Sequence, residues 1–306
     1  MRHFGKTAIG VTLAAISVMA FAATFVVGSA LTRTYRVSPE VLACVRFVVA
    51  CAVLLPLACA TRDGRRRFFA ATRWDWFVLA VLGPIGSSFM AWCIFKGCSL
   101  VSTANASMAD ALTPLLMFVF AAVSARRIHI VQVVGMLFGF LGALFVIGIV
   151  NADGVALSAY SRGDVYVLLA ATAWAVYSVY GRATIARLGS GVYTCWTMLF
   201  GALAFVPVLV FGTFTWPSTL RAWGLLAVLG LGCTLLPFWA WNAAQKYLPV
   251  STLGVSAYFT PVVAVVLAGI FLGERATLLQ WMGTLFVCAS ALVEFKTPPL
   301  TRNAGE

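Results

Sequence analysis

The sequence predicts an all-α integral membrane protein with ten transmembrane helices arranged as two inverted five-helix repeats. Three observations support this prediction: the composition, the number of long apolar runs and an internal repeat. Of the 306 residues, 62% are hydrophobic and only 10% are charged. A water-soluble domain carries roughly 25% charged residues, so lipid must be the solvent for much of this chain.

Ten apolar runs are long enough to be membrane helices, since a bilayer core takes about 20 helical residues. Open strands would leave backbone groups unpaired in lipid, so we expect each run to be helical. The gaps between the runs are too short to hold a soluble domain. The predicted spans are residues 8–31, 41–60, 76–95, 103–124, 130–150, 165–180, 192–212, 222–244, 251–272 and 277–293.

The positions of Lys and Arg predict the orientation. With an inside N-terminus, 14 of the 21 basic residues fall in inner segments and 6 in outer loops, while Arg46 lies within a span. Cytoplasmic segments carry the excess of Lys and Arg, so we expect a multi-pass protein of the cytoplasmic (inner) membrane with both termini cytoplasmic. The formal charge of +12 sits in short clusters between apolar runs, which argues against nucleic acid as a partner.

The chain lacks the patterns of metal, cofactor and catalytic sites. Its eight cysteines form no Cys-x-x-Cys pair, and its two histidines, His3 and His129, lie near the ends of predicted spans. A phosphate-cradling loop is also missing. We therefore predict no metal, no cofactor and no enzymatic activity; an integral membrane enzyme is the alternative from a different functional class.

An internal repeat relates the two halves. Trp76-x-x-Leu-Ala-Val-Leu-Gly83 recurs as Trp223-x-x-Leu-Ala-Val-Leu-Gly230, and Thr113-Pro114 recurs as Thr260-Pro261, both shifted by 147 positions. Five spans is an odd number, so the second copy must be inverted in the membrane. Inverted repeats are typical of secondary transporters, although a purely structural duplication is the alternative. We assign residues 1–150 to the first repeat, 160–296 to the second and 297–306 to a cytoplasmic tail.

Several short motifs, in this order along the chain, resemble one known family. They are Arg46-Phe47, Asn105-Ala-Ser107 running to Pro114, Arg162-Gly-Asp164 followed by Ala173-Trp174-Ala175-Val176-Tyr177, and Pro261 followed by Leu272-Gly-Glu274-Arg275. Together they resemble the EamA-type transporters of the drug/metabolite transporter superfamily. The resemblance implies ten helices around a central cavity and, commonly, export of amino acids or related metabolites. The first repeat departs from it, with Ala125-Arg126-Arg127 in place of Gly-Glu-Arg.

Two ionisable residues, Arg46 and Asp110, are predicted deep in the membrane. Each lies eight residues past an outer serine, or roughly 12 Å from the surface. Ionisable groups within a bilayer are costly and usually have partners, so we expect the two side chains to meet. The pair either fixes two helices structurally or takes part in substrate binding.

Two prolines mark the same depth. Pro114 and Pro261 each lie about ten residues into their spans, and each removes a hydrogen bond to the carbonyl four residues earlier. Those carbonyls, of Asp110 and Ala257, are predicted to be available to a substrate at mid-membrane. A packing kink without a binding role is the alternative.

Aromatic and amide side chains complete the predicted cavity. Trp174, Tyr177 and Tyr180 recur at steps of three residues on one helix, and Tyr258 lies beside the freed carbonyl of Ala257. The predicted substrate-binding residues are Arg46, Trp92, Asn105, Asp110, Pro114, Trp174, Tyr177, Tyr180, Trp239, Asn242, Tyr258 and Pro261.

These features predict a secondary transporter, an exporter or facilitator, that moves a small metabolite such as an amino acid by alternating access around a mid-membrane cavity. Its partners are the small-molecule substrate and the lipid bilayer, and the protein is expected to be a monomer or homodimer. A lipid-linked sugar or phosphate flippase of the same superfamily is the alternative. A phosphate would require several basic groups in the cavity, where Arg46 is the one predicted.

Overall fold

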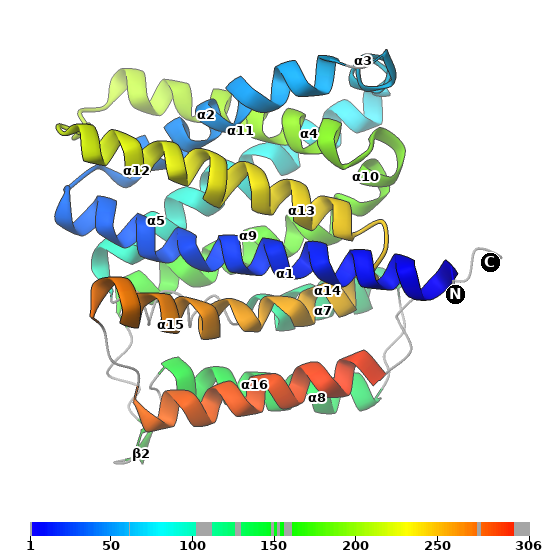
Figure 1. Ribbon diagram of the computed structural model, residues 1–306, viewed down its shortest axis with the longest axis vertical. Coiled ribbons are helices and arrows are strands. Elements are labelled where there is room, and N and C mark those ends of the chain that lie inside the picture. Colours follow the sequence, from blue (N-terminus) through cyan, green and yellow to red (C-terminus); the bar gives the residue numbers. More distant parts are fainter. Residues whose placement is uncertain are drawn as a thin grey trace.

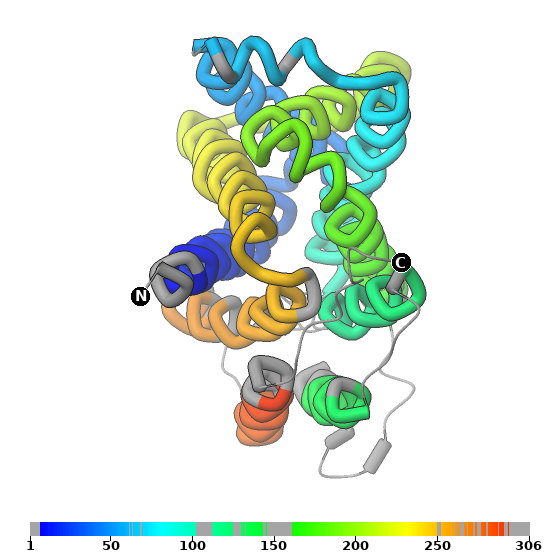
Figure 2. Tube along the Cα trace, turned by 90° about the vertical axis from the view of Figure 1, so that its right-hand side faces the viewer, coloured from blue at the N-terminus to red at the C-terminus, as the bar shows by residue number. Residues whose placement is uncertain are grey.

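The computed structural model describes residues 2–60, 62–101, 112–125, 130–147, 150–151, 154–155, 161–273 and 277–296. Most of these residues form helices that run roughly side by side, as Figures 1 and 2 show in two perpendicular views. The α-helices are α1 (Arg2–Ser29), α2 (Pro39–Ala60), α3 (Arg62–Phe69), α4 (Arg73–Pro84), α5 (Met90–Leu100), α7 (Thr113–Ala125), α8 (Ile130–Ile147), α9 (Arg162–Tyr180), α10 (Arg182–Leu188), α11 (Ser190–Phe211), α12 (Leu220–Gly230), α13 (Leu236–Ala244), α14 (Val250–Ala257), α15 (Phe259–Leu272) and α16 (Leu278–Lys296).

Five helical segments are long and apolar enough to cross a membrane. They are Thr7–Thr34, Pro39–Ala60, Arg73–Leu100, Ser190–Phe211 and Leu220–Ala244, and each overlaps a predicted span. The shortest have 22 residues, roughly 33 Å of helix against a hydrocarbon core of about 30 Å. Shorter apolar helices at Thr113–Ser124, Val133–Gly142 and Trp281–Ser290 fall within three further predicted runs. The chain is thus a multi-pass membrane protein, while the count of ten spans stays a prediction.

Two of the long segments contain a five-residue π-helical turn near the middle. η2 (Ile85–Phe89) joins α4 to α5, and η5 (Leu231–Leu235) joins α12 to α13; a third π turn, η1 (Ala30–Thr34), ends the first long segment. Proline lies next to both mid-span turns, as Pro84 before η2 and Pro237 after η5. Proline cannot donate a backbone hydrogen bond, so regular α-helical pairing is interrupted at both places.

The helices pack in a pattern that links the two halves of the chain. α1 packs against α13 and α15, and α9 packs against α5 and α7. In the same way, α4 packs against α11 and α12 packs against α2, while α2 and α11 contact each other. α8 and α16 form a pair set apart from the other helices (Figure 2). Gly135 of α8 allows this close pairing, since an added Cβ would lie 3.1 Å from Val293 of α16.

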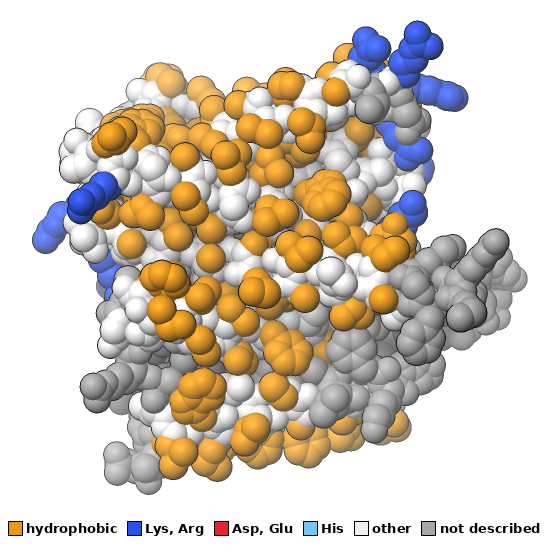
Figure 3. All heavy atoms as spheres, viewed as in Figure 1, with side chains coloured by type: hydrophobic (Ala, Val, Ile, Leu, Met, Phe, Trp, Pro, Cys, Tyr) orange, Lys and Arg blue, Asp and Glu red, His pale blue; other side chains and the backbone are white. Residues whose placement is uncertain are grey.

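Apolar side chains cover the outer surface of the helices. The face shown in Figure 3 is largely hydrophobic, with Lys and Arg gathered toward the two ends of the helices. Met19 of α1, Val228 of α12, Ile270 of α15 and Leu285 of α16 are all exposed. Exposed apolar area on this scale is unfavourable in water and matches the hydrocarbon core of a bilayer.

In the part of the chain that the structure describes, the fold is helical, as predicted, except for one small hairpin in which β1 (Val150–Asn151) pairs antiparallel with β2 (Gly154–Val155). The hairpin lies at one end of the molecule. The start of α1, the end of α16, and helices α3 and α10 lie at the other (Figure 1). Neither α3 nor α10 is among the predicted spans; both are short helices in segments expected to face the cytoplasm.

Candidate functional site

A cavity of about 980 Å³, here called the vestibule, opens at the end of the molecule that carries α3 and α10. The helices around it come from both halves of the chain. Its lining residues are Ile9, Leu13, Leu54, Leu57, Ala58, Gly64, Arg67, Arg182, Ile185, Ala186, Leu188, Gly189, Ser190, Gly191, Val192, Trp239, Asn242, Ala243, Gln245, Lys246 and Tyr247.

The vestibule is positively charged. Arg67, Arg182 and Lys246 line it, and its described lining includes no Asp or Glu. Burial lowers the pKa of the Arg182 guanidinium from its usual value, but an arginine remains a cation at neutral pH. Fixed charges of one sign in a recess raise the local concentration of oppositely charged solutes. The vestibule therefore attracts anions.

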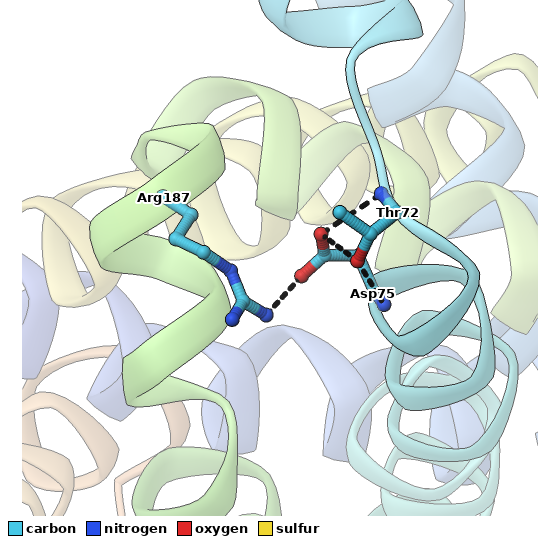
Figure 4. Close-up of polar contacts among 3 residues, drawn as sticks. All are labelled: Thr72, Asp75 and Arg187. Atoms are coloured by element: carbon cyan, nitrogen blue, oxygen red, sulfur yellow. Dashed lines mark hydrogen bonds and ion pairs between the residues drawn. The ribbon is translucent and has the colours of Figure 1, made fainter.

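An ion pair anchors α10 at the edge of the vestibule. Arg187 donates to the carboxylate of Asp75 at the start of α4 (Figure 4). The other carboxylate oxygen accepts from the backbone N–H of Thr72 at 3.0 Å and from its hydroxyl at 2.7 Å. Thr72 and Asp75 thus form a capping box at the start of α4, and Asp75 also joins α4 to α10. Because Arg187 neutralises this carboxylate, the pair adds no net charge at the edge of the vestibule.

Asn242 of α13 forms the polar floor of the vestibule. Its side-chain N–H₂ donates to the Tyr177 hydroxyl at 2.9 Å and to the Thr194 hydroxyl at 2.8 Å. Its oxygen accepts from Gln245 at 3.4 Å. Buried amides are stable when their hydrogen bonds are satisfied, so Asn242 ties together α13, α9 and α11.

Beneath this floor lies a layer of packed rings, here called the aromatic cluster: Phe21, Trp174, Tyr177, Phe238 and Trp241. The Trp174 ring stacks on Tyr177 at 5.2 Å between centroids and lies 5.5 Å from Trp241. Phe21 and Phe238 meet Trp174 edge to face, at 5.0 and 4.9 Å. Aromatic pairs prefer these stacked and edge-to-face arrangements, so the cluster is a well-packed barrier.

A second, smaller cavity, here called the inner pocket, borders the cluster. Its volume is about 30 Å³, enough for roughly one water molecule. It is lined by Phe21, Thr24, Phe25, Arg46, Met90, Ile94, Thr113, Trp174, Trp241, Ala257 and Thr260. Phe21, Trp174 and Trp241 belong to both the pocket lining and the cluster.

Arg46 is the charged residue of the inner pocket. Its side chain is fully buried, and one terminal nitrogen, Nη2, donates to the Cys233 carbonyl at 3.3 Å. The guanidinium lies 5.0 Å from the centre of the Phe47 ring and 5.3 Å from that of Phe95. Its Nε and Nη1 atoms have no hydrogen-bond partner within the described part of the chain.

The repeated Thr-Pro motifs meet at the inner pocket. Thr113 and Thr260, which precede the two prolines, both line it, as does Ala257. The helix that contains Pro261 is broken between α14 and α15. Ala257 lies four residues before Pro261, so its carbonyl has lost its usual N–H partner at that position. Elements of both halves therefore form this pocket.

A third cavity is apolar and opens between α1 and the α14–α15 region. It measures about 310 Å³ and is lined by residues such as Val11, Met19 and Phe259, all of which are exposed. In a bilayer, lipid tails would fill such a groove. Eight of its ten lining residues are apolar, the others being Thr252 and Ser256, so we do not include it in the site.

The other predicted site residues are spread more widely. Trp92 donates to the Glu40 carboxylate at 2.8 Å and packs on Tyr166, while Trp239 lines the vestibule. Tyr180 is 48% exposed. The Tyr258 hydroxyl lies against α8, where an added Cβ at Gly139 would be 2.5 Å away. Pro114 is buried, whereas Asn105 and Asp110 lie outside the described residues.

Sequence reasoning missed several lining residues. Phe21, Phe25 and Thr24 lie on the first span, which carried no distinguishing motif. Thr113 and Thr260 belong to the repeated Thr-Pro motif. Their shared shift of 147 positions was a signal that could have identified them as lining residues. In the sequence, the arginines of the vestibule contributed only to the prediction of the membrane orientation.

Known proteins share this sequence pattern and fold. The EamA-like transporter family model matches residues 8–148 and again residues 161–295. The uncharacterized transporter YyaM of Bacillus subtilis (strain 168) is 25% identical, over 83% of this chain and 84% of that protein. The aromatic amino acid exporter YddG of Ancylobacter novellus is 29% identical, over 63% of this chain and 66% of the exporter.

One crystal structure of a protein superposes with a TM-score of 0.71 at 24% sequence identity, covering 94% of this chain and 96% of that chain, and so has the same fold. The family match extends over almost the whole chain, and the relatives named above are transporters. This chain is therefore a member of the EamA-like transporter family.

Proposed function

We propose that this protein is a secondary transporter, an exporter or facilitator, that carries a small metabolite such as an amino acid by alternating access. One observation carries the proposal: Asn242 at the floor of a wide vestibule contacts the aromatic cluster, and a small pocket that holds Arg46 borders the same cluster. A carrier open to one side and closed to the other has this arrangement. Movement of a few rings would join the two cavities.

The packing pattern supports an inverted repeat of residues 1–150 and 160–296. Exchanging each span of the first half with its counterpart in the second converts the α1–α13 contact into α9–α5, and α1–α15 into α9–α7. Both π turns and both Thr-Pro motifs also follow this exchange. In such a protein the two halves can swap shapes and so turn an inward opening outward.

The predicted orientation places the vestibule on the cytoplasmic side. Arg67, Arg182 and Lys246 surround it, and basic residues are retained on that side of a membrane. With both termini cytoplasmic, the structure would be the inward-open form of a cytoplasmic-membrane carrier. A substrate leaving the cell would enter through the vestibule.

The walls of the inner pocket support an amphipathic substrate. Phe25, Trp174 and Trp241 offer apolar ring surfaces beside the hydroxyls of Thr24 and Thr260. Rings of this kind bind flat apolar groups, and a zwitterion with an aromatic or aliphatic side chain suits both parts. The similarity to an aromatic amino acid exporter agrees with this substrate class.

A second candidate, a flippase for a lipid-linked sugar or phosphate, is favoured by the apolar groove between α1 and α15, which would suit a lipid tail. The three vestibule cations would suit a phosphate. The groove and the vestibule are separate cavities, however, so we favour the metabolite carrier.

Reconstitution into liposomes tests the proposal. Liposomes preloaded with an unlabelled amino acid mixture should take up labelled phenylalanine by saturable exchange, and Trp174→Ala should reduce this exchange severalfold. Tyr180→Ala is a matched control on the same helix, because Tyr180 is exposed. No exchange of any amino acid above protein-free liposomes would contradict the metabolite carrier. Translocation of a lipid-linked sugar in the same vesicles would support the flippase.

The same vesicles test coupling to protons. Asp110 is the one acidic residue predicted deep in a span, so proton-driven transport would have to use it. We expect exchange without dependence on an imposed pH gradient. Uphill accumulation that collapses with an ionophore and disappears in Asp110→Asn would instead establish a proton-coupled carrier.

A further inference from the structure

We infer that Arg46 is the binding site for a carboxylate of the transported metabolite, so that the substrates are small organic anions or zwitterions with a flat apolar part. This inference rests on the proposed transport function and adds the chemical class of the substrate. Its starting point is the guanidinium of Arg46, which is fully buried with Nε and Nη1 unpaired within the described residues.

Among the residues that the structure describes, the surroundings of Arg46 do not satisfy its charge. A guanidinium has five N–H donors, and the Cys233 carbonyl accepts one weak bond at 3.3 Å. The rings of Phe47 and Phe95 add cation–π attraction, but they accept no strong hydrogen bond. Buried charges are normally paired with an opposite charge. Within the described part of the chain no anion fills this role, which leaves the position open to a bound anion.

Three carboxylates of the described residues are engaged elsewhere. Glu40 accepts from Trp92, Asp75 pairs with Arg187, and Asp164 caps α9 by accepting from the Ser161 backbone. None of the three lines the inner pocket. Asp110 lies outside the described residues, and a pair between it and Arg46 is the competing hypothesis.

A carboxylate fits the donor geometry of arginine. Its two oxygens accept from two guanidinium N–H groups at once, which gives a short, charge-assisted pair. In the pocket, the rest of the molecule would then meet the faces of Phe25, Trp174 and Trp241 and the Thr24 hydroxyl. This combination selects a carboxylate joined to an apolar or aromatic group.

The route to Arg46 favours the same charge. Arg67, Arg182 and Lys246 line the vestibule, so an anion is concentrated there before it reaches the aromatic cluster. At about 30 Å³, the inner pocket holds roughly one water molecule. Binding therefore requires the cluster to move, as expected if substrate is captured during the change between open forms.

Matched ligands test the inference on the purified full-length protein. Phenylalanine, 3-phenylpropionate and phenethylamine share a benzyl group but differ in whether they carry the carboxylate. We expect the first two to raise the unfolding temperature of the wild type and phenethylamine to have no effect. Arg46→Gln should weaken phenylpropionate binding at least about tenfold, with partial recovery in Arg46→Lys. Arg33→Gln is the control, since Arg33 also donates to a cysteine carbonyl but lies outside the inner pocket.

Several results would overturn the inference: no stabilisation by either carboxylate ligand, equal stabilisation by phenethylamine, or unchanged phenylpropionate affinity in Arg46→Gln. If Arg46→Gln does not fold, the three-ligand comparison on the wild type and on Arg46→Lys decides. Recovery of Arg46→Gln stability by a second change, Asp110→Asn, would show that the two side chains neutralise each other, and would favour the competing pair. If ligand binding depends on Arg46 but no exchange occurs in liposomes, the transport function alone is contradicted. If exchange occurs equally well with substrates that lack a carboxylate, this inference alone is contradicted.

Discussion

The side-chain amide of Asn242 donates a hydrogen bond to the hydroxyl of Tyr177 at 2.9 Å, joining α13 to α9 at the floor of the vestibule. Both helices belong to the second half of the chain, residues 160–296. The first half contributes Phe21 to the rings directly below. The floor is therefore held mainly by the second half of the chain.

Substitutions at this floor should differ in cost. Asn242→Leu removes the hydrogen bonds to Tyr177, Thr194 and Gln245, whereas Tyr177→Phe keeps the ring and the bond between Asn242 and Thr194. An interhelical hydrogen bond within a membrane contributes about 0.6 kcal/mol on average. We expect a loss of about 1–2 kcal/mol for Asn242→Leu and about half that for Tyr177→Phe, measured by unfolding in detergent. Tyr180→Phe, the control, should leave the free energy of unfolding unchanged. An equal loss in this control would contradict a specific role for the Tyr177 hydroxyl.

The contact between η2 and α9 predicts intolerance of a methyl group at Gly86. An added Cβ would lie 2.4 Å from the Cβ of Tyr177, and overpacking typically costs about 1–3 kcal/mol. Gly86→Ala should therefore lower both thermal stability and exchange activity. The control is Gly224→Ala in α12, where a Cβ would meet nothing within 4 Å. If Gly86→Ala were as stable as this control, the packing of η2 on α9 would be wrong.

Asp75 and Arg187 form an ion pair, but we expect the two residues to contribute unequally to the stability of the protein. Asp75→Ala removes the ion pair and also the carboxylate half of the capping box with Thr72, and loss of a capping interaction costs about 1 kcal/mol. Arg187→Gln leaves the carboxylate its two bonds from Thr72. The Arg187 side chain is 50% exposed, so its loss should cost less than about 1 kcal/mol. Thermal unfolding of both variants, with exposed Arg66→Gln as the control, should give this order, and the reverse order would show that the ion pair dominates.

Single cysteines test the orientation. In a variant without the eight native cysteines, Arg65→Cys in α3 should react with a membrane-impermeant thiol reagent only after the membrane is permeabilised. Gly154→Cys in β2 should react in intact cells, because the hairpin lies at the opposite end of the molecule (Figure 1). Labelling of both positions from the same side would remove the basis for the inward-open assignment.

The sequence was sufficient for the family and for the approximate helix ends. The predicted runs 41–60 and 222–244 correspond to α2 and to the α12–α13 segment within two residues at each end. Hydrophobicity sets these limits, since apolar residues must fill the bilayer thickness. The burial of Arg46 was also predictable, because a charged residue inside an apolar run almost always faces the protein interior.

The directions of individual side chains were less predictable. Trp174, Tyr177 and Tyr180 recur every three residues, but each step of three falls about 60° short of a full α-helical turn. Tyr180 therefore points about 120° away from Trp174 and is exposed. Tyr258 lies at the break between α14 and α15, where regular helical geometry no longer fixes the direction of the next side chain. Its position against Gly139 depends on tertiary packing.

The π turn η5 has a consequence for how this protein family can vary. A π turn corresponds to a single residue inserted into an α-helix, and one residue advances the helical phase by about 100°. The angular positions of Trp241 and Asn242 around their helix axis are therefore set by chain length between residues 231 and 235, not by side-chain identity alone. A one-residue deletion there would leave the span apolar and nearly as long, yet would turn both side chains toward a different neighbour. Insertions and deletions inside a membrane helix, which are usually regarded as damaging, would thus be a direct way to reshape the cavity of a related transporter.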